Sequence, residues 1–271
     1  GSDRLALIQV IPFRRFALPM AGSFLFAGLL TGVGGSVCSA CRSLKTITFE
    51  EGVKNVGTFF AYLCTSLESV SLPESLKSIS ASAFSYSGLQ FISIPDSVTR
   101  VDNDTFSNCK RLTSVKLSKG MSIINMSTFA DCSALESIEI PDTVTIIGNN
   151  AFSFSGLKSV VLPEGVTRIG ENAFYSCEQL SEITLPSTLN TIGGYAFYNC
   201  DGLTTVALPA SLETIGNYVF YDCDGLKEIS LPASLTSMGA FAFSNSESLE
   251  KVVFEGEMEN IGIWSFAGCT A

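Results

Sequence analysis

The stretch TIGGYAFYNCDGLTTVALPASLETIGNYVFYDCDGLKEISLPASL occupies residues 191–235 and contains nearly the same phrase twice. Each copy runs from Ile-Gly to an aromatic residue, then to Cys, then to Leu, and a β-rich stretch closes it on Leu-Pro. A long phrase that recurs at a fixed spacing is the sequence signature of a repeat protein.

The aromatic residue of the phrase marks the period along the chain, and we call it the marker. It recurs every 22 to 24 residues at Phe60, Phe84, Phe106, Phe129, Phe152, Phe174, Phe197, Phe220, Phe243 and Phe266. One further unit lies upstream, with Cys38 in the marker position. Residues 33–271 are therefore predicted to form one array of about eleven units.

Each unit is predicted to contain two short extended segments and one compact turn. Residues 180–186 (LSEITLP) alternate apolar and polar side chains, and the proline ends the strand. Residues 194–200 (GYAFYNC) are expected to form a helical or 3-10 turn that carries Phe197 and Cys200 inward. Because a 23-residue unit cannot bury its own apolar face, the units must stack. The sequence thus predicts a repeat solenoid, mainly β with short helical turns.

The consensus LP-x-SL-x-x-IG-x-x-AF-x-x-C-x-x-L-x-x-I-x-LP resembles the BspA-like leucine-rich repeat family of bacterial and protozoan surface proteins. The resemblance covers about 240 of the 271 residues. It implies a right-handed, curved leucine-rich-repeat array at the cell surface or secreted, with a role in adhesion or in contact with protein or glycan partners. It implies no catalytic residue and no cofactor.

Composition excludes several classes of function. The net charge of −10 gives no electrostatic footprint for a phosphate backbone, so we expect no nucleic-acid partner. The chain has no histidine, which rules out His-based triads, bases and zinc ligands. With no phosphate-binding loop and no paired acids of defined geometry, the sequence predicts a protein that is not an enzyme.

Residues 1–32 depart from the repeat and allow two interpretations. Residues 16–33 carry no charge and follow Arg14 and Arg15, which is typical of a secretory leader or a membrane anchor. The segment also contains Pro19 and several glycines and joins the first repeat without a polar linker, which favours an atypical first repeat that caps the solenoid. Membrane contact is expected only if residues 16–33 are an anchor.

One position of the repeat alternates between cysteine and serine. Its members are Cys41, Cys64, Ser87, Cys109, Cys132, Ser155, Cys177, Cys200, Cys223, Ser246 and Cys269. A position shared by these residue types is small and faces inward, so the thiols are predicted to be free, buried and unreactive. The Cys38–Cys41 pair lacks the second pair that a zinc or redox site needs, and we expect it to belong to the core and to bind no metal.

Aromatic side chains concentrate in two columns of the C-terminal units. The first comprises Tyr195, Tyr218, Phe241 and Trp264, and the second Tyr175, Tyr198 and Tyr221. The columns are three residues apart, so on a helical turn they share one face. We expect an aromatic strip in the C-terminal half alone, which either stiffens the solenoid by stacking on itself or serves as a platform for a partner.

An acidic column repeats every 23 residues just after the cysteine position. It comprises Glu178, Asp201, Asp224 and Glu247. Four like charges about 5 Å apart repel by roughly 1 kcal/mol per neighbouring pair in water, so something must offset them. Turn capping is the favoured interpretation, and a cation or a basic partner surface is the alternative.

The outward strand positions are predicted to line the concave side of the array. They are small, hydroxylated or charged and include Ser114, Lys116, Glu139, Glu182, Thr184 and Glu228. Such a face can dock a protein or can simply be a solvated sheet face. The sequence therefore supports two hypotheses: a non-enzymatic binding module that acts through this face or the aromatic strip, and a structural spacer without a specific ligand.

Overall fold

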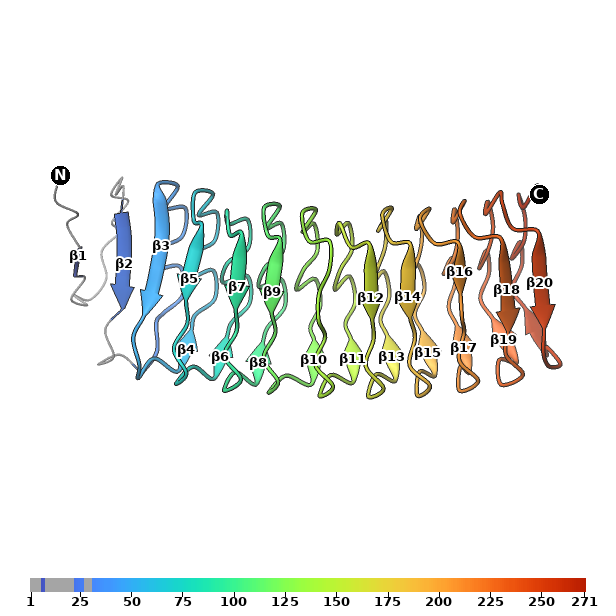
Figure 1. The fold of residues 1–271 in the computed structure, drawn as a ribbon, viewed down its shortest axis with the longest axis horizontal. Coiled ribbons are helices and arrows are strands. Elements are labelled where there is room, and N and C mark those ends of the chain that lie inside the picture. The colour runs from blue at the N-terminus through green and yellow to red at the C-terminus, as the bar shows by residue number, and fades with distance from the viewer. Residues whose placement is uncertain (1–5, 8–21, 27–30) are drawn as a thin grey trace.

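The computed structural model describes residues 6–7, 22–26 and 31–271. In them the chain winds as a parallel β-solenoid of about ten coils, which lie side by side in a row (Figure 1). Each complete coil runs through a first strand row, a second strand row and then the turn that carries the marker. The described residues form no helix, and all pairs of their strands are parallel.

The first row consists of the upper strands of Figure 1. Its members are β1 (Ala6–Leu7), β2 (Gly22–Phe26), β3 (Leu44–Phe49), β5 (Ser69–Ser71), β7 (Phe91–Ser93), β9 (Ser114–Lys116), β12 (Ser159–Val161), β14 (Glu182–Thr184), β16 (Thr205–Val206), β18 (Glu228–Leu231) and β20 (Lys251–Phe254). They pair as β1-β2-β3-β5, β7-β9, β12-β14 and β16-β18-β20.

The second row contains shorter strands. Its members are β4 (Asn55–Val56), β6 (Ser78–Ile79), β8 (Arg100–Val101), β10 (Ile123–Ile124), β11 (Ile146–Ile147), β13 (Arg168–Ile169), β15 (Thr191–Ile192), β17 (Thr214–Ile215), β19 (Ser237–Met238) and β21 (Asn260–Ile261). They form the sheet β4-β6-β8 and the seven-stranded sheet β10-β11-β13-β15-β17-β19-β21.

Register explains why the phrase recurs. Ile147 pairs with Ile169, Ile169 with Ile192, and Ile192 with Ile215, so one column of like side chains crosses four coils. All four are buried. Each coil therefore offers its neighbour the same apolar side chain at the same height, and burial is continuous along the array.

The marker rings form the centre of this core. Nine of them, from Phe84 to Phe266, lie in one uninterrupted stack with neighbouring centroids 5.3–5.8 Å apart and planes tilted by 4–11°. The first eight are fully buried, and Phe266 is partly buried against the core. Large side chains that are withdrawn from water and packed on both faces contribute strongly to stability.

In the second unit the marker position lies one residue after the predicted Phe60. The amide of Ala61 donates to the carbonyl of Ala83 at 2.7 Å, which is the bond that Phe106 makes to Thr128 at 3.0 Å in a later coil. Ala61 therefore occupies the marker position, and Phe60 fills the preceding inward position, edge-on to Phe84 at 6.3 Å. The large and the small side chain have exchanged positions in this coil, so the total side-chain volume in the core is conserved.

The marker turn is not helical, contrary to the expectation for residues 194–200. Tyr195 and Asn199 have φ of 58° and 55°, in the left-handed region. The amides of Tyr195 and Phe197 donate to Asn217 and Val219 of the next coil at 2.8 and 2.9 Å, whereas the amide of Ala196 closes a turn within its own coil. Alternate amides thus bond between coils, which satisfies the backbone without a helix.

A glycine column holds neighbouring coils close together after the second-row strands. The amide of Gly216 donates to Ile192 at 2.9 Å, and a Cβ at Gly216 would lie 2.4 Å from the backbone nitrogen of Gly194. No side chain fits at that distance from backbone atoms. Glycine is required here for close approach and not for an unusual φ.

We expect Gly216→Ala to lower the free energy of unfolding by about 1–3 kcal/mol, because the coils must move apart to admit the methyl group. Gly34→Ala is the matched control, since a Cβ there meets nothing closer than Val37 at 4.0 Å. That variant should be neutral or more stable by about 0.4–1 kcal/mol, because it restricts the unfolded chain. Urea unfolding of both proteins checks the prediction, and equal effects would contradict it.

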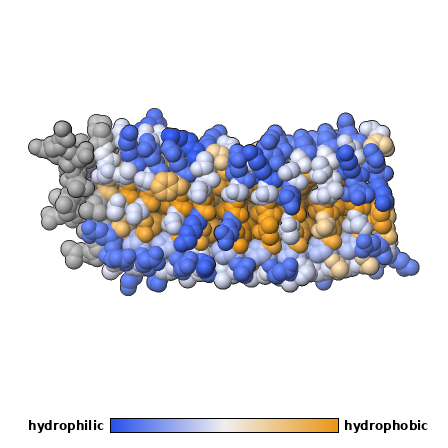
Figure 2. All heavy atoms as spheres, in the orientation of Figure 1, coloured by the Kyte–Doolittle hydropathy of each residue, from blue (hydrophilic) through white to orange (hydrophobic). Residues whose placement is uncertain are grey.

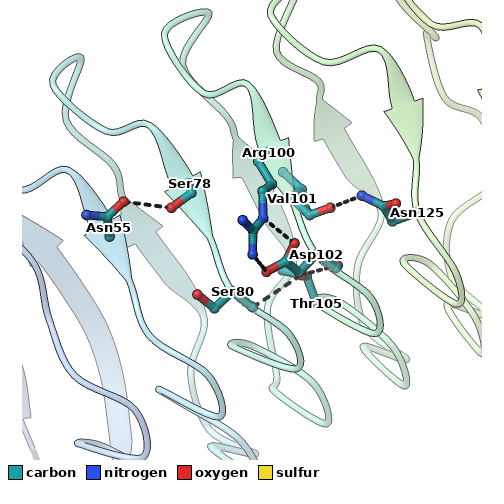
Figure 3. Close-up of polar contacts among 8 residues, drawn as sticks. All are labelled: Asn55, Ser78, Ser80, Arg100, Val101, Asp102, Thr105 and Asn125. Atoms are coloured by element: carbon teal, nitrogen blue, oxygen red, sulfur yellow. Dashed lines mark hydrogen bonds and ion pairs between the residues drawn. The ribbon is translucent and has the colours of Figure 1, made fainter.

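One coil replaces this glycine amide with a side chain. Asn125 Nδ2 donates to the carbonyl of Val101 at 2.6 Å, at the boundary between the two second-row sheets (Figure 3). The equivalent Gly148 uses its backbone amide to reach Ile124 at 2.7 Å. Nearby, Arg100 forms an exposed ion pair with Asp102 at 2.6 Å. The side-chain amide keeps adjacent coils connected where the ladder is interrupted.

The N-terminal segment is described only in part. β2 pairs with β3, and Phe24 is buried at this end of the core. Residues 1–5, 8–21 and 27–30 lie outside the described residues. The interpretation of residues 1–32 as a cap or a leader, and the division at residue 33, therefore remain predictions.

Candidate functional site

The aromatic columns of the C-terminal coils form two adjoining stacks, which we call the aromatic edge. Tyr218 lies between Tyr195 and Phe241 with both centroid distances at 4.7 Å. Tyr198 lies between Tyr175 and Tyr221 at 4.8 and 5.0 Å. The stacks touch where Tyr195 meets Tyr198 at 5.9 Å and where Tyr218 meets Tyr221 at 5.5 Å.

Trp264 is the one predicted member that stands apart. It belongs to the same column but makes no ring contact in the described part of the chain, and its side chain is 65 % exposed. The structure therefore brings six of the seven predicted aromatic residues together, across the coils that contain β13, β15, β17 and β19.

Ring orientation determines what the aromatic edge offers to a partner. The planes of stacked neighbours differ by only 4–9°, so each inner ring has a ring on both of its faces. The edges and hydroxyl groups are what solvent reaches, and Tyr195 is 37 % exposed. Burial, followed by the neighbouring Tyr175, Tyr221 and Asp222, raises the pKa of Tyr198. Tyr198 therefore remains a neutral hydrogen-bonding group at physiological pH.

The aromatic contacts are not confined to the C-terminal half, contrary to expectation. Phe59 and Tyr62 meet edge to face at 5.3 Å, and Tyr62 meets Tyr86 at 5.6 Å. Phe154 meets Tyr175 at 5.3 Å and extends the aromatic edge by one coil. The misplaced second marker concealed the first group, because counting from Ala61 puts Phe59 and Tyr62 in the two aromatic columns.

The acidic column caps turns between coils. Asp224 Oδ1 accepts the amide of Glu247 at 3.2 Å, so a carboxylate of one coil caps the turn of the next. Burial raises the pKa of Asp201. The backbone amide of Asp224 lowers this pKa by a hydrogen bond, whereas the negative charges of Asp224, Asp222 and Glu178 raise it. Capping, the favoured interpretation, is thus observed at Asp224. In the described residues no group of three or more potential ligands is arranged to hold a metal ion.

The coils that carry the aromatic edge are rich in acidic residues. Between Arg168 and Lys227 the chain has no cationic side chain and seven carboxylates, which are Glu171, Glu178, Glu182, Asp201, Glu213, Asp222 and Asp224. The ion pairs of the described residues involve Glu68, Asp102, Glu136 and Glu228, so none of these seven carboxylates is paired there. These coils therefore carry an excess of unpaired carboxylates, of which Asp222 lies close enough to Tyr198 to raise its pKa.

The cysteine position has a hydrogen-bonding role that sequence reasoning missed. The thiols of Cys200 and Cys223 donate to the marker carbonyls of the preceding coils, Phe174 and Phe197, at 3.1 and 3.0 Å. The hydroxyl of Ser246 makes the same bond to Phe220 at 2.8 Å. Ser87 and Ser155 instead pair with the thiols of Cys109 and Cys177, both at 3.3 Å, so the position suits a small hydrogen-bonding group of either type. All nine thiols are free as predicted, although Cys41 and Cys269 are only half-buried.

The predicted strand-face residues all lie on the first strand row or directly beside it, with exposed side chains. They are Ser114, Lys116, Glu139, Glu182, Thr184 and Glu228. Glu228 forms an ion pair with Lys251 at 3.6 Å. The space-filling view shows an apolar band that runs the length of the molecule between polar margins (Figure 2).

A shallow hollow of about 480 Å³ lies on this face where the first row is interrupted between β9 and β12. One bridge between Lys116 and Glu139 connects the coils there. The hollow is lined by Ser137, Ile138, Glu139, Ile140, Asp142, Ser159, Val160, Val161 and Pro163. It contains two carboxylates and two hydroxyls, but it offers no nucleophile beside a base.

Comparison with known proteins agrees with this geometry. The family model described as BspA type leucine rich repeat region matches residues 31–158 and 145–271, with six copies. The chain belongs to this family. A search of the curated proteins found no match. Within the described residues, no helical segment has the length and hydrophobicity that a bilayer span needs.

Solved structures similar to this BspA-type chain come from several bacteria. A leucine-rich repeat protein from Bacteroides ovatus has 24 % identity and a TM-score of 0.50, covering 94 % of this chain and 86 % of its own. A leucine rich cell surface protein from Faecalibacterium prausnitzii has 24 % identity and a TM-score of 0.53, covering 86 % and 79 %. Pneumococcal vaccine antigen PcpA has 20 % identity and a TM-score of 0.57, covering 83 % and 66 %. At these identities the likeness concerns the fold.

Proposed function

We propose that this chain is a non-enzymatic binding module, displayed at the cell surface or secreted, that mediates adhesion by recognising a partner through its aromatic edge. The observation that carries the proposal is the pair of adjoining stacks in which six aromatic side chains share one solvent-facing edge. Tyrosine and tryptophan are the residue types that most often dominate binding energy at protein interfaces.

Two further observations support the proposal. The BspA-type repeat makes the stacks rigid, because each ring is attached to a turn whose amides bond to the next coil. A preorganised surface loses little conformational entropy on binding, which raises its affinity for a partner. The similar leucine rich protein of F. prausnitzii is described as a cell surface protein, which supports an extracellular location for this chain.

We expect Tyr195→Ala combined with Tyr218→Ala to weaken binding to a partner at least tenfold, because it removes two adjacent rings of the aromatic edge. An array of purified matrix proteins and glycans, probed with the unmodified chain, identifies a partner of micromolar or better affinity, and titration then compares the variant. Phe91→Ala is the matched control, since Phe91 is 54 % exposed on the strand face. It should leave the affinity within twofold.

The outcomes separate the candidate surfaces and functions. Loss of affinity in Phe91→Ala alone would move the site to the strand face, where Ser114 is the register partner of Phe91 and Lys116 and Glu139 lie nearby. Unchanged affinity in both variants would remove the aromatic edge from the proposal. If the folded chain binds no member of the array, the structural spacer is favoured and the stacks serve only to stiffen the solenoid.

A further inference from the structure

We infer that the aromatic edge recognises a Lys- and Arg-rich segment of a protein and does not recognise a glycan. The inference rests on the proposed function and specifies the partner of the same surface. Two observations carry it: the closed faces of the inner rings Tyr198 and Tyr218, and the unpaired carboxylates of the same coils, of which Asp222 acts on Tyr198.

Closed ring faces exclude the usual contact with sugars at the two inner rings, Tyr198 and Tyr218. A sugar binds an aromatic side chain by laying its C–H surface on an open ring face. Tyr198 has Tyr175 on one face and Tyr221 on the other, at 4.8 and 5.0 Å, in planes tilted by 7° and 5°. Tyr218 is enclosed in the same way by its two neighbours. No sugar ring fits between rings at that spacing.

The exposed hydroxyl groups can serve a partner that donates hydrogen bonds. Tyr221 receives a bond from Asn245 Nδ2 at 2.8 Å. The hydroxyl groups of Tyr175, Tyr195, Tyr198 and Tyr218 have no protein partner in the described part of the chain. Their oxygens can accept from ammonium and guanidinium groups, which carry three and five N–H donors respectively and accept no bond themselves.

Charge favours the same partner. Asp222 lies close enough to Tyr198 and to Asp224 for their charges to affect one another, and Asp201 is in turn affected by Asp222, Asp224 and Glu178. These carboxylates repel one another, and no cation of the described residues is paired with them. A basic segment placed along the aromatic edge would relieve this repulsion and accelerate association.

The test compares three probes with the folded chain by titration calorimetry at 50 and 300 mM NaCl. The probes are a deca-lysine peptide, a deca-glutamate peptide and maltoheptaose. The first variant is Asp222→Asn with Asp224→Asn, which removes two charges and keeps the side-chain oxygen that caps Glu247. The control is Glu213→Gln, an exposed carboxylate that directly precedes β17.

Deca-lysine alone should bind, and its affinity should fall at least tenfold between the two salt concentrations. The double variant should weaken binding at least fivefold at 50 mM NaCl, and Glu213→Gln should change it less than twofold. Equal weakening by both would show attraction to net charge alone and would overturn the inference. Binding of maltoheptaose that Tyr195→Ala with Tyr218→Ala abolishes would also overturn it while leaving the proposed function intact.

Discussion

Phe197→Ala is expected to lower the free energy of unfolding by about 3–5 kcal/mol. The ring of Phe197 is fully buried, with Phe174 on one face and Phe220 on the other, both at 5.3 Å. Neighbouring coils are held at a fixed spacing by their backbone bonds, so they cannot close around the cavity that the ring leaves. The loss of transfer free energy and the cavity cost therefore add.

Urea unfolding monitored by circular dichroism measures this effect. Phe91→Ala is the control, because it removes the same ring from an exposed position and should change stability by less than about 0.5 kcal/mol. If both variants lose the same stability, the marker stack is not the centre of the core. A change in the denaturant slope would instead indicate that the array no longer unfolds as one unit.

Raising the pH above 9 is expected to destabilise the fold strongly. Burial raises the pKa of Cys109 and Cys177 to about 11, and that of Cys223 to about 12, from an ordinary value of 9. A thiol with a raised pKa holds its proton in the folded state when the unfolded chain has lost it. The stabilisation is thus complete below pH 9 and is lost as pH rises toward 11.

Each such thiol adds a slope of about 1.4 kcal/mol per pH unit across that window, so Cys109 and Cys177 together should cost several kcal/mol. Thermal unfolding between pH 7 and 11 measures the effect. The control is Cys109→Ser with Cys177→Ser, which retains a donor at both positions but does not titrate. Its stability should fall less steeply above pH 9, and an identical slope would show that other groups cause the alkaline loss.

The solenoid, its period and its inward columns could be predicted from the sequence because repetition supplies the same evidence many times. A single Ile or Leu is ambiguous, but Ile169, Ile192 and Ile215 at equal spacing define one face. The burial of the markers and of most thiols follows from the same columns. Physically, parallel stacking forces equivalent residues into equivalent environments, so the sequence pattern and the contact pattern coincide.

The turn geometry could not be predicted from the sequence, because the residue pattern within one coil does not show the hydrogen bonds that the neighbouring coil supplies. Tyr195 and Tyr218 adopt a positive φ that is uncommon for bulky residues, and bonds from the next coil stabilise it. The donor role of Cys200 likewise depends on a carbonyl 26 residues earlier. Phe60 and Ala61 could exchange places because the core responds to total volume in the coil.

The aromatic edge illustrates the same limit. Columns in the sequence correctly indicated that six rings share one edge, because their spacing repeats from coil to coil. The sequence did not reveal that the rings close one another's faces, since this depends on side-chain orientation. That orientation changes the expected partner from any aromatic-binding ligand to one that reaches hydroxyl groups and carboxylates.

Removing a single complete coil tests most directly whether the coils are interchangeable units of one core. Deletion of residues 193–215 joins Ile192 to Gly216 and preserves the register of every column. The shortened chain is expected to keep its β circular-dichroism spectrum and to unfold in one cooperative transition near the original temperature. Deletion of residues 193–203, which removes half a coil, should abolish that transition. If the chain without residues 193–215 fails to fold, or if the two deletion variants are equally stable, the coils are not interchangeable units of one core.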